Sequence, residues 1–203
     1  MSLDSTAKKI LEAARAEFLE KGFEKSSMRS IAAKVGITAT ALYRHYQDKE
    51  SIFDALVLPA THLLQNTYDE IKDSLYTTLA HSGPEAMWEQ ENGNFAVLVD
   101  QIYANFDAYK LILCCSAGTK HTEYIHELVN RMQEDTFYFM ETAKANGHPI
   151  KDVDPMEFHL LLSAQYFAFF EMVKHDFSYE QALHYADVLE EFFRPSWKAF
   201  LGF

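Results

Sequence analysis

Apolar residues recur at helical spacing from the start of the chain. Ala7, Ile10, Leu11 and Ala14 lie three or four positions apart, and Phe18 continues the series. This period places them on one face of an amphipathic helix. A glycine at position 22 then stands where a left-handed residue ends a helix, so the first helix is expected to end there.

Two shorter helices are expected next, each with its own start and stop signal. Ser27 is suited to capping the second helix, and Gly36 to ending it after about two turns. Thr38 is expected to cap a third helix that reaches Tyr46. Asp48 then caps a fourth helix, so three short helices precede a long one.

The fourth helix is predicted to begin near Lys49 and to continue beyond Pro59 to about Leu75. Because proline lacks a backbone N–H, Pro59 is expected to kink this helix and to act as a hinge. Turn-forming residues follow at 81–84 and 91–94, and further helices are predicted over 95–115, 121–146, 155–175 and 179–200. The expected fold is therefore all-α.

Residues 28–46 have the build of a helix-turn-helix, with a short helix, a glycine-containing turn and a second helix. The outer face of the second helix carries small residues, which let a backbone approach base edges in a major groove. Arg44 and His45 are long enough to reach outward from it. The hydroxyl of Tyr43 is suited to a phosphate.

The stretch SSMRSIAAKVGITATALYRHYQDKESIF resembles the DNA-binding domain of the TetR family of bacterial transcriptional regulators. It has that family's A-x-x-x-G-[VI] turn and its L-Y-x-[HY]-[FY] recognition helix. The resemblance covers residues 7 to 53. It implies that DNA backbone is held by Ser27, Tyr43 and Lys49. It also implies that the residues near bases are Arg29, Thr38, Ala39, Thr40, Arg44 and His45.

The resemblance also implies a division of labour. Residues 1–50 would form an N-terminal three-helix helix-turn-helix domain, joined by the long helix to a helical ligand-binding and dimerisation domain over 51–203. The charges of the chain are also distributed unevenly between these two regions. Residues 1–50 hold nine Lys or Arg against seven Asp or Glu, which gives a net charge of +2. Since the whole chain carries −12, residues 51–203 carry −14. A mildly positive front on an acidic body is suited to approaching nucleic acid end-on.

Composition supports a helical intracellular protein. With 48% hydrophobic residues but only 7 Gly and 5 Pro, the chain has little material for the turns of an all-β fold. No apolar run approaches the roughly 20 residues that span a bilayer, so no membrane partner and a cytoplasmic location are expected. The only cysteines, Cys114 and Cys115, are neighbours and predict no disulfide framework.

Catalytic and metal motifs find little support. Glu123 and His126 form one Glu-x-x-His pair, whereas a di-iron bundle needs two such pairs and two more glutamates. No glycine-rich phosphate loop, nucleophile elbow or CxxC motif occurs. No enzyme activity, metal or cofactor is therefore expected.

Aromatic residues crowd the later helices and suggest a ligand cavity. A carboxylate beside such rings would favour a cationic guest, so the small-molecule effector is expected to be apolar or a cationic aromatic. Ordinary core packing explains many of these rings equally well. The expected ligand-binding residues are Tyr103, Phe106, Phe137, Met140, Tyr166 and Phe170.

A dimer is expected because two recognition helices must reach successive major grooves of a pseudo-palindromic operator. The expected interface residues are Leu160, Ala164, Phe167, Leu189 and Phe193. The main hypothesis is thus a homodimeric repressor of double-stranded operator DNA that a small molecule releases. Two alternatives stay open: a similar DNA-binding protein without small-molecule input, and a helical enzyme or scaffold that does not read DNA.

Overall fold

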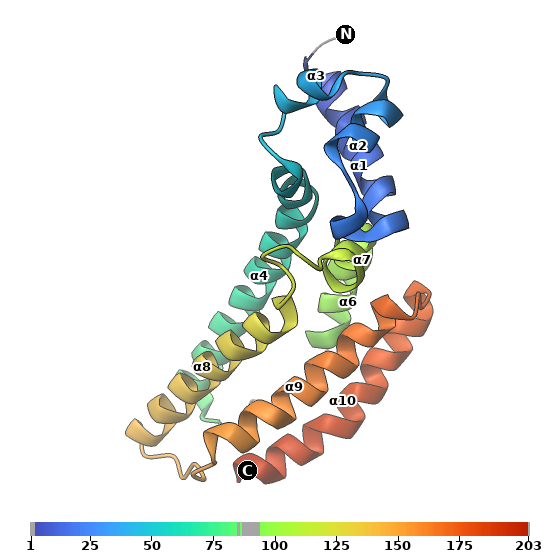
Figure 1. Ribbon diagram of the computed structural model, residues 1–203. Coiled ribbons are helices and arrows are strands. Elements are labelled where there is room, and N and C mark those ends of the chain that lie inside the picture. The colour runs from blue at the N-terminus through green and yellow to red at the C-terminus, as the bar shows by residue number, and fades with distance from the viewer. Residues whose placement is uncertain (1–2, 85, 87–93, 203) are drawn as a thin grey trace. The chain divides into compact units, whose positions relative to one another are not determined.

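The computed structural model describes residues 3–84, 86 and 94–202, and within these ranges the regular structure is helical (Figure 1). The expected all-α fold is confirmed. None of the described helices is both long and apolar enough to cross a membrane. The helices are α1 (Leu3–Lys25), α2 (Met28–Val35), α3 (Ala39–Tyr43), α4 (Lys49–Ser82), α6 (Asn94–Ala104), α7 (Phe106–Cys115), α8 (Tyr124–Ala145), α9 (Pro155–Lys174) and α10 (Tyr179–Leu201).

The chain divides into two compact units. Unit 1 contains residues 1–63 and 104–123, and unit 2 contains residues 64–103 and 124–203. Helix α4 belongs to both, because its first half lies in unit 1 and its second half in unit 2. The expected functional division after residue 50 remains a prediction. The compact unit that includes residues 1–50 also takes in the start of α4 and all of α7.

The caps and the glycine interruptions of the first helices of unit 1 lie at residues that the sequence predicts. Gly22 interrupts α1 with a φ of 77°, and Gly36 ends α2 in the left-handed region with a φ of 76°. Ser27 caps α2 in a reciprocal box with Ser30. The side chain of Thr38 accepts the N–H of Ala41 at 3.1 Å and so caps α3.

The third helix is shorter than predicted. Its helical geometry ends at Tyr43, and a tighter turn follows in which the N–H groups of His45 and Tyr46 bond the carbonyl of Leu42 at 2.9 and 3.1 Å. The spacing of Leu42 and Tyr46 is kept through this turn, because the N–H of Tyr46 still bonds the carbonyl four positions back, as in an α-helix.

The single helix predicted over 95–115 is wrong. The chain breaks at Asn105, whose φ of −134° and ψ of 35° separate α6 from α7. The break places buried Tyr109 so that its hydroxyl donates to the carbonyl of Ala60 on α4 at 2.9 Å. Apolar spacing is helical on both sides of Asn105, so the pattern alone did not reveal the interruption.

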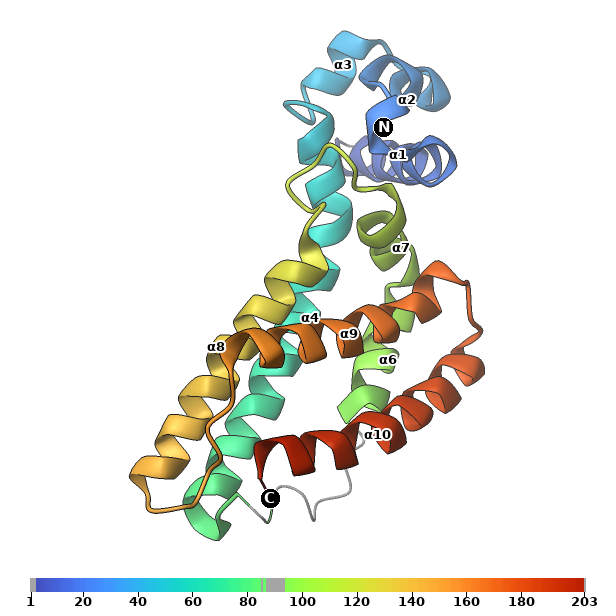
Figure 2. The same cartoon turned by 60° about the horizontal axis from the view of Figure 1, so that its bottom comes forward.

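The core of unit 1 gathers around α1, which packs against both α2 and α7. The rings of Phe18, Phe23 and Phe53 meet at centroid distances of 5.5 to 5.7 Å. Figures 1 and 2 place α3 and α7 at opposite ends of this unit. The helix-turn-helix is thus supported from one side and left open on the other.

One charged residue lies inside this core. Glu17 on α1 is fully buried and contacts two lysines, Lys21 at 2.9 Å and Lys34 at 2.7 Å. The contact with Lys34, aided by Lys21, lowers the pKa of Glu17 to about 2, although burial acts in the opposite direction. Because Lys34 lies on α2, this ion pair fixes α2 against α1.

Unit 2 is a layer of helices in which the second half of α4 lies along α8 (Figure 2). Arg131 on α8 donates to Asp69 on α4 at 2.8 Å, and the hydroxyl of Tyr68 donates to Asp135 at 3.0 Å. Helix α9 packs against both α8 and α10. Phe95 of α6 stacks on Phe169 of α9 at 4.8 Å, which closes the core of this unit.

Candidate functional site

The outer surface of the helix-turn-helix carries three uncommitted polar side chains. Arg29 and Arg44 are exposed and Tyr43 is 54% exposed. Within the described residues, none of these three side chains makes a hydrogen bond or ion pair. Because Arg offers five N–H donors and Tyr one O–H, this surface presents free donors of the kind that bind phosphates and base edges.

Small residues lie between these donors, as the sequence predicted. Thr38 and Thr40 are exposed, and Ala39 is half-buried. The oxygen of Thr38 accepts the capping bond, but its O–H remains able to donate outward. Ser27, also exposed, has its hydroxyl 2.9 Å from that of Ser30. Because these side chains are small, the backbone of the recognition helix can come close to DNA.

His45 is held closer to the protein, since its ring is half-buried. Its place at the tight turn after α3 leaves part of the ring exposed. Its expected position near bases stays a prediction.

Lys49 is the predicted phosphate contact whose surroundings differ most from expectation. Its ammonium donates to the carbonyls of Phe23 and Ser26 at 2.6 and 2.9 Å and lies 4.1 Å from the centre of the Phe23 ring. Burial lowers the pKa of Lys49. The ammonium therefore links the start of α4 to the end of α1. A phosphate contact at this position would come from the main-chain N–H groups of the first turn of α4.

Unit 2 encloses two adjoining cavities of about 310 and 210 Å³. They share a wall of α4 formed by Tyr68, Ile71 and Leu75, with Thr136 of α8 and Leu201 of α10. Together they reach the size of sites that bind small organic molecules. The sequence pattern did not indicate a ligand site at these α4 residues, although it showed their helical spacing.

Polar groups enter the larger cavity at a few points. Glu190 of α10 accepts the N–H of Phe95 at 3.1 Å, and burial raises the pKa of Glu190. Gln165 accepts the indole N–H of Trp197 at 2.6 Å. Arg194 also lines this cavity. A few fixed polar groups among aromatic walls are typical of a small-molecule site.

The six residues predicted to bind a ligand are dispersed in the structure. Tyr166 lines the larger cavity and Met140 the smaller one, whereas Phe106 lines a separate cavity in unit 1. The hydroxyl of Tyr103 donates to the carbonyl of Phe177 at 2.7 Å.

The other two rings belong to the packing of unit 2. Phe137 packs on Phe158 at 5.2 Å, and Phe170 is 1% exposed against Phe169. Neither is among the residues that line the cavities.

The predicted interface residues are split between surface and interior. Leu160 and Phe167 are 61% and 45% exposed, and Ala164 is exposed beside them on one face of α9. Phe193 is half-buried, while Leu189 is only 6% exposed and packs inside its own unit. The exposed apolar residues of α10 include Val188 and Phe192, the latter 69% exposed.

Neither Cys114 nor Cys115 forms a disulfide within the described residues. Cys114 is exposed and Cys115 is buried, and burial raises the pKa of Cys115. A raised pKa lowers the thiolate fraction at neutral pH, so the Cys115 thiol is poorly reactive.

The helix-turn-helix matches a known family in sequence. Residues 10–56 match the family described as bacterial regulatory proteins, tetR family. The chain is 30% identical over 111 residues to the uncharacterized HTH-type transcriptional regulator YvdT of Bacillus subtilis, covering 54% of this chain and 50% of YvdT. It is 40% identical over 52 residues to the HTH-type transcriptional repressor BepR of Brucella suis, covering 26% of this chain and 25% of BepR. The chain thus spans half or less of the length of these curated relatives.

Solved structures share the fold over the whole chain. The chain resembles native NalD of Pseudomonas aeruginosa with a TM-score of 0.56 and 18% identity, covering 99% of each chain. It resembles Salmonella enterica GusR with a TM-score of 0.50 and 21% identity, covering 99% of this chain and 97% of GusR. At these identities the likeness concerns the fold alone.

The described residues thus combine an all-helical fold with a capped helix-turn-helix near the N-terminus, which is the architecture of helical DNA-binding regulators. Residues 10–56 therefore carry a helix-turn-helix of the TetR family, and the curated relatives over this region are described as transcriptional regulators, not as enzymes. The resemblance inferred from residues 7 to 53 is thereby confirmed, and the alternative of a helical enzyme is set aside.

Proposed function

We propose that this protein binds double-stranded operator DNA through α3 and represses transcription as a homodimer in the cytoplasm. The observation that carries the proposal is the open face of the helix-turn-helix, where Tyr43 and Arg44 project from a capped, small-residue helix. A helix whose outer face carries small and polar side chains is able to enter a major groove. Repression is supported by the curated relative BepR, which is described as a transcriptional repressor.

Exposed apolar side chains support the homodimer. Met156, Leu160 and Phe167 on α9, with Val188 and Phe192 on the adjacent α10, are 43 to 69% exposed. An isologous contact of two helices from each subunit would cover them. In such a dimer the two α3 helices would read half-sites about 34–36 Å apart.

Gel shift tests the proposal directly. Full-length protein is incubated at a stated salt concentration with the DNA upstream of its own gene and with a scrambled duplex of equal composition. Specific binding is expected to be at least about 1,000-fold tighter than binding to the scrambled duplex. Equal affinity for the two duplexes would reject operator recognition.

The adjoining cavities of unit 2 are the proposed effector site. Helix α4 lines both with Tyr68, Ile71 and Leu75, and the same helix begins in unit 1 at Lys49. An effector that shifts the second half of α4 would therefore act on the helix that leads into the DNA-binding unit. A coupling free energy of about 1–3 kcal/mol would weaken operator binding by roughly 5–150-fold.

Pro59 tests this route because it lies inside α4 near the boundary between the units. A thermal-shift screen first identifies a ligand, and operator affinity is then measured with and without it in wild type and Pro59→Ala. A hinge predicts a smaller effect of the ligand in the variant, since alanine restores the missing backbone hydrogen bond. The same loss of affinity in both proteins would exclude Pro59 as a hinge. A protein without small-molecule input would give no ligand that alters operator affinity.

A further inference from the structure

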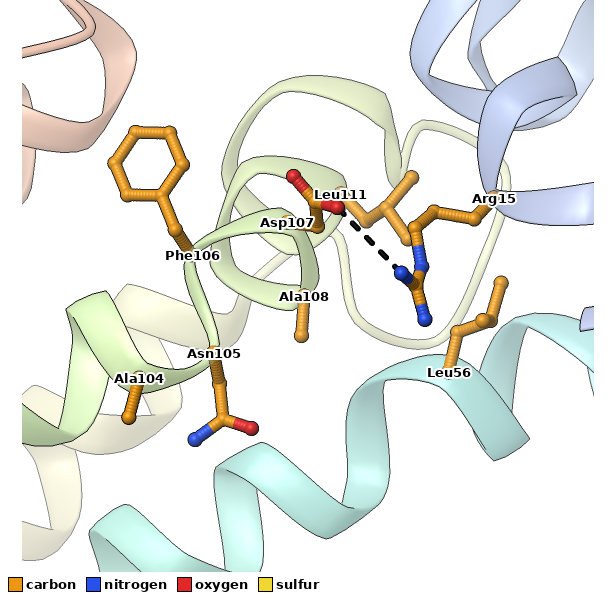
Figure 3. Close-up of a pocket in the computed structure, with 8 residues that line it drawn as sticks. All are labelled: Arg15, Leu56, Ala104, Asn105, Phe106, Asp107, Ala108 and Leu111. Carbon is orange, nitrogen blue, oxygen red and sulfur yellow. Dashed lines mark ion pairs between the residues drawn. The ribbon is translucent and has the colours of Figure 1, made fainter. Parts of the chain in front are cut away.

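Unit 1 contains a cavity that is unrelated to either proposed binding site. It has a volume of about 340 Å³ and lies where α1, α4 and the junction of α6 with α7 meet (Figure 3). None of its lining residues lines the cavities of unit 2. None belongs to the helix-turn-helix surface. Its principal lining residues are Arg15, Leu56, Asn105, Asp107, Ala108 and Leu111.

Two opposite charges lie beside each other in the lining of this cavity. Arg15 Nη1 lies 3.6 Å from Asp107 Oδ2, and the two side chains are 46% and 55% exposed. This distance is longer than a hydrogen bond, and within the described residues neither side chain has another partner. An ion pair this exposed contributes little to stability. Both side chains therefore keep most of their capacity to bind a ligand.

An apolar wall stands beside the charged pair. Figure 3 shows the side chains of Leu56 and Ala108 directed toward the space next to Arg15, whereas the ring of Phe106 points away from the pair. Leu111 is fully buried behind this wall. The amide of Asn105 lines the same cavity and offers both a donor and an acceptor. The cavity thus combines a cation, an anion, an amide and aliphatic carbon.

The balance of these charges selects the ligand. A simple carboxylate would pair with Arg15 but would be repelled by Asp107, and a simple amine would meet the reverse problem. A zwitterion satisfies both, since its carboxylate pairs with the guanidinium and its ammonium with the carboxylate. From this geometry we infer that the unit 1 cavity binds a free α-amino acid with an aliphatic side chain, which packs against Leu56 and Ala108.

Calorimetry on the full chain without DNA tests this inference. The probes are L-leucine, 4-methylpentanoate, which lacks the amino group, and 3-methylbutylamine, which lacks the carboxylate. L-Leucine is expected to bind at least about tenfold more tightly than either analogue, because each analogue can pair with only one of the two charged side chains. Absence of leucine binding, or equal binding of leucine and one analogue, would overturn the inference.

Charge-matched variants locate the site. Arg15→Gln and Asp107→Asn are each expected to weaken leucine binding at least about tenfold. Lys8→Gln and Glu12→Gln, which remove the same charges from exposed positions on α1, should leave it unchanged. Circular dichroism verifies that all four variants are folded. Leucine binding that survives both Arg15→Gln and Asp107→Asn would reject this cavity. Because no DNA is present, that result would leave operator recognition unaffected.

Discussion

The two units expose their chemistry in different ways. In unit 1 the polar groups proposed to bind DNA project from a helix whose caps are encoded within a few residues of each other. In unit 2 the proposed effector site is an interior space lined by residues from α4, α6, α8, α9 and α10. A local site can be located from one short stretch of sequence. A site assembled from distant helices requires their packing to be known.

The same difference applies to charge. The exposed Arg29 and Arg44 are available to a partner, whereas the charged groups between α4 and α8 are paired within the protein. Asp135 receives both the Tyr68 hydroxyl and the Lys72 ammonium, at 3.0 and 3.3 Å. Unit 2 therefore uses such groups to hold α4 against α8, whereas unit 1 leaves Arg29 and Arg44 on its surface.

The largest effect is expected at the outer face of unit 2. Phe167→Glu and Phe192→Glu would place a charge in the proposed dimer interface and are expected to weaken self-association by at least about 100-fold, because the buried carboxylate would have no partner. Light scattering reads the mass, and circular dichroism should show helicity retained.

Tyr138→Glu is the matched control, since Tyr138 is as exposed as Phe192 but lies on α8. If the two phenylalanine variants remain dimeric, the interface lies elsewhere. If Tyr138→Glu alone yields monomers, α8 rather than α9 and α10 forms it.

A second prediction concerns the interior of unit 1. Glu17→Gln removes the charge of a buried ion pair and is expected to lower the free energy of unfolding at pH 7 by about 3 kcal/mol. Because the pKa of Glu17 is lowered to about 2 from 4.5, the wild-type carboxylate stabilises the fold above pH 4.5. This advantage should fade as the pH falls from 4.5 toward 2.

Denaturant unfolding at several pH values measures both effects. Glu20→Gln is the control, because Glu20 also contacts Lys34 but its side chain is 63% exposed. Its cost should stay below about 0.5 kcal/mol. A pH-independent difference between wild type and Glu17→Gln would contradict the assigned pKa.

The DNA-facing residues provide a third prediction. Arg44→Ala is expected to cost about 1–3 kcal/mol and to relax specificity at one symmetric pair of operator positions, if Arg44 contacts a base edge. Gel shifts on operators substituted at each position measure this. A uniform loss on every operator would instead make Arg44 a contact to the DNA backbone.

Tyr43→Phe is expected to have a smaller effect, since it removes one hydroxyl from an exposed ring and leaves α3 unchanged. The loss should be about 1 kcal/mol and equal for all sequences, as for a single phosphate hydrogen bond. A loss confined to particular operators would assign Tyr43 to base recognition.

Lys49 gives the smallest expected effect on DNA binding. The contacts of its ammonium are intramolecular and include the carbonyls of Phe23 and Ser26. Lys49→Met should therefore lower stability by about 1–2 kcal/mol and leave the salt dependence of operator binding nearly unchanged. A reduction of the salt slope by about 1 would show that the ammonium reaches a phosphate in the complex.

The sequence by itself determined the helices of unit 1 and the surface they present. Ser27, Gly36 and Thr38 act on backbone groups no more than four or five positions away, so their effects are local and can be predicted without knowledge of the fold. The residues on the exposed face of α3 follow from the same register. Family resemblance pointed to the same stretch because those local constraints recur in it.

The tertiary structure decided the rest. Whether Lys49 faces solvent or the carbonyls of α1 depends on how α4 meets α1, and the break at Asn105 depends on contacts such as that of Tyr109 with Ala60. Helical spacing identifies a buried face but not the helix that covers it. For this reason Leu189, predicted at a surface between subunits, lies inside its own unit, while Tyr68 and Glu190 line a cavity. Such positions are fixed by packing between residues far apart in the chain. The period of one helix does not encode this packing.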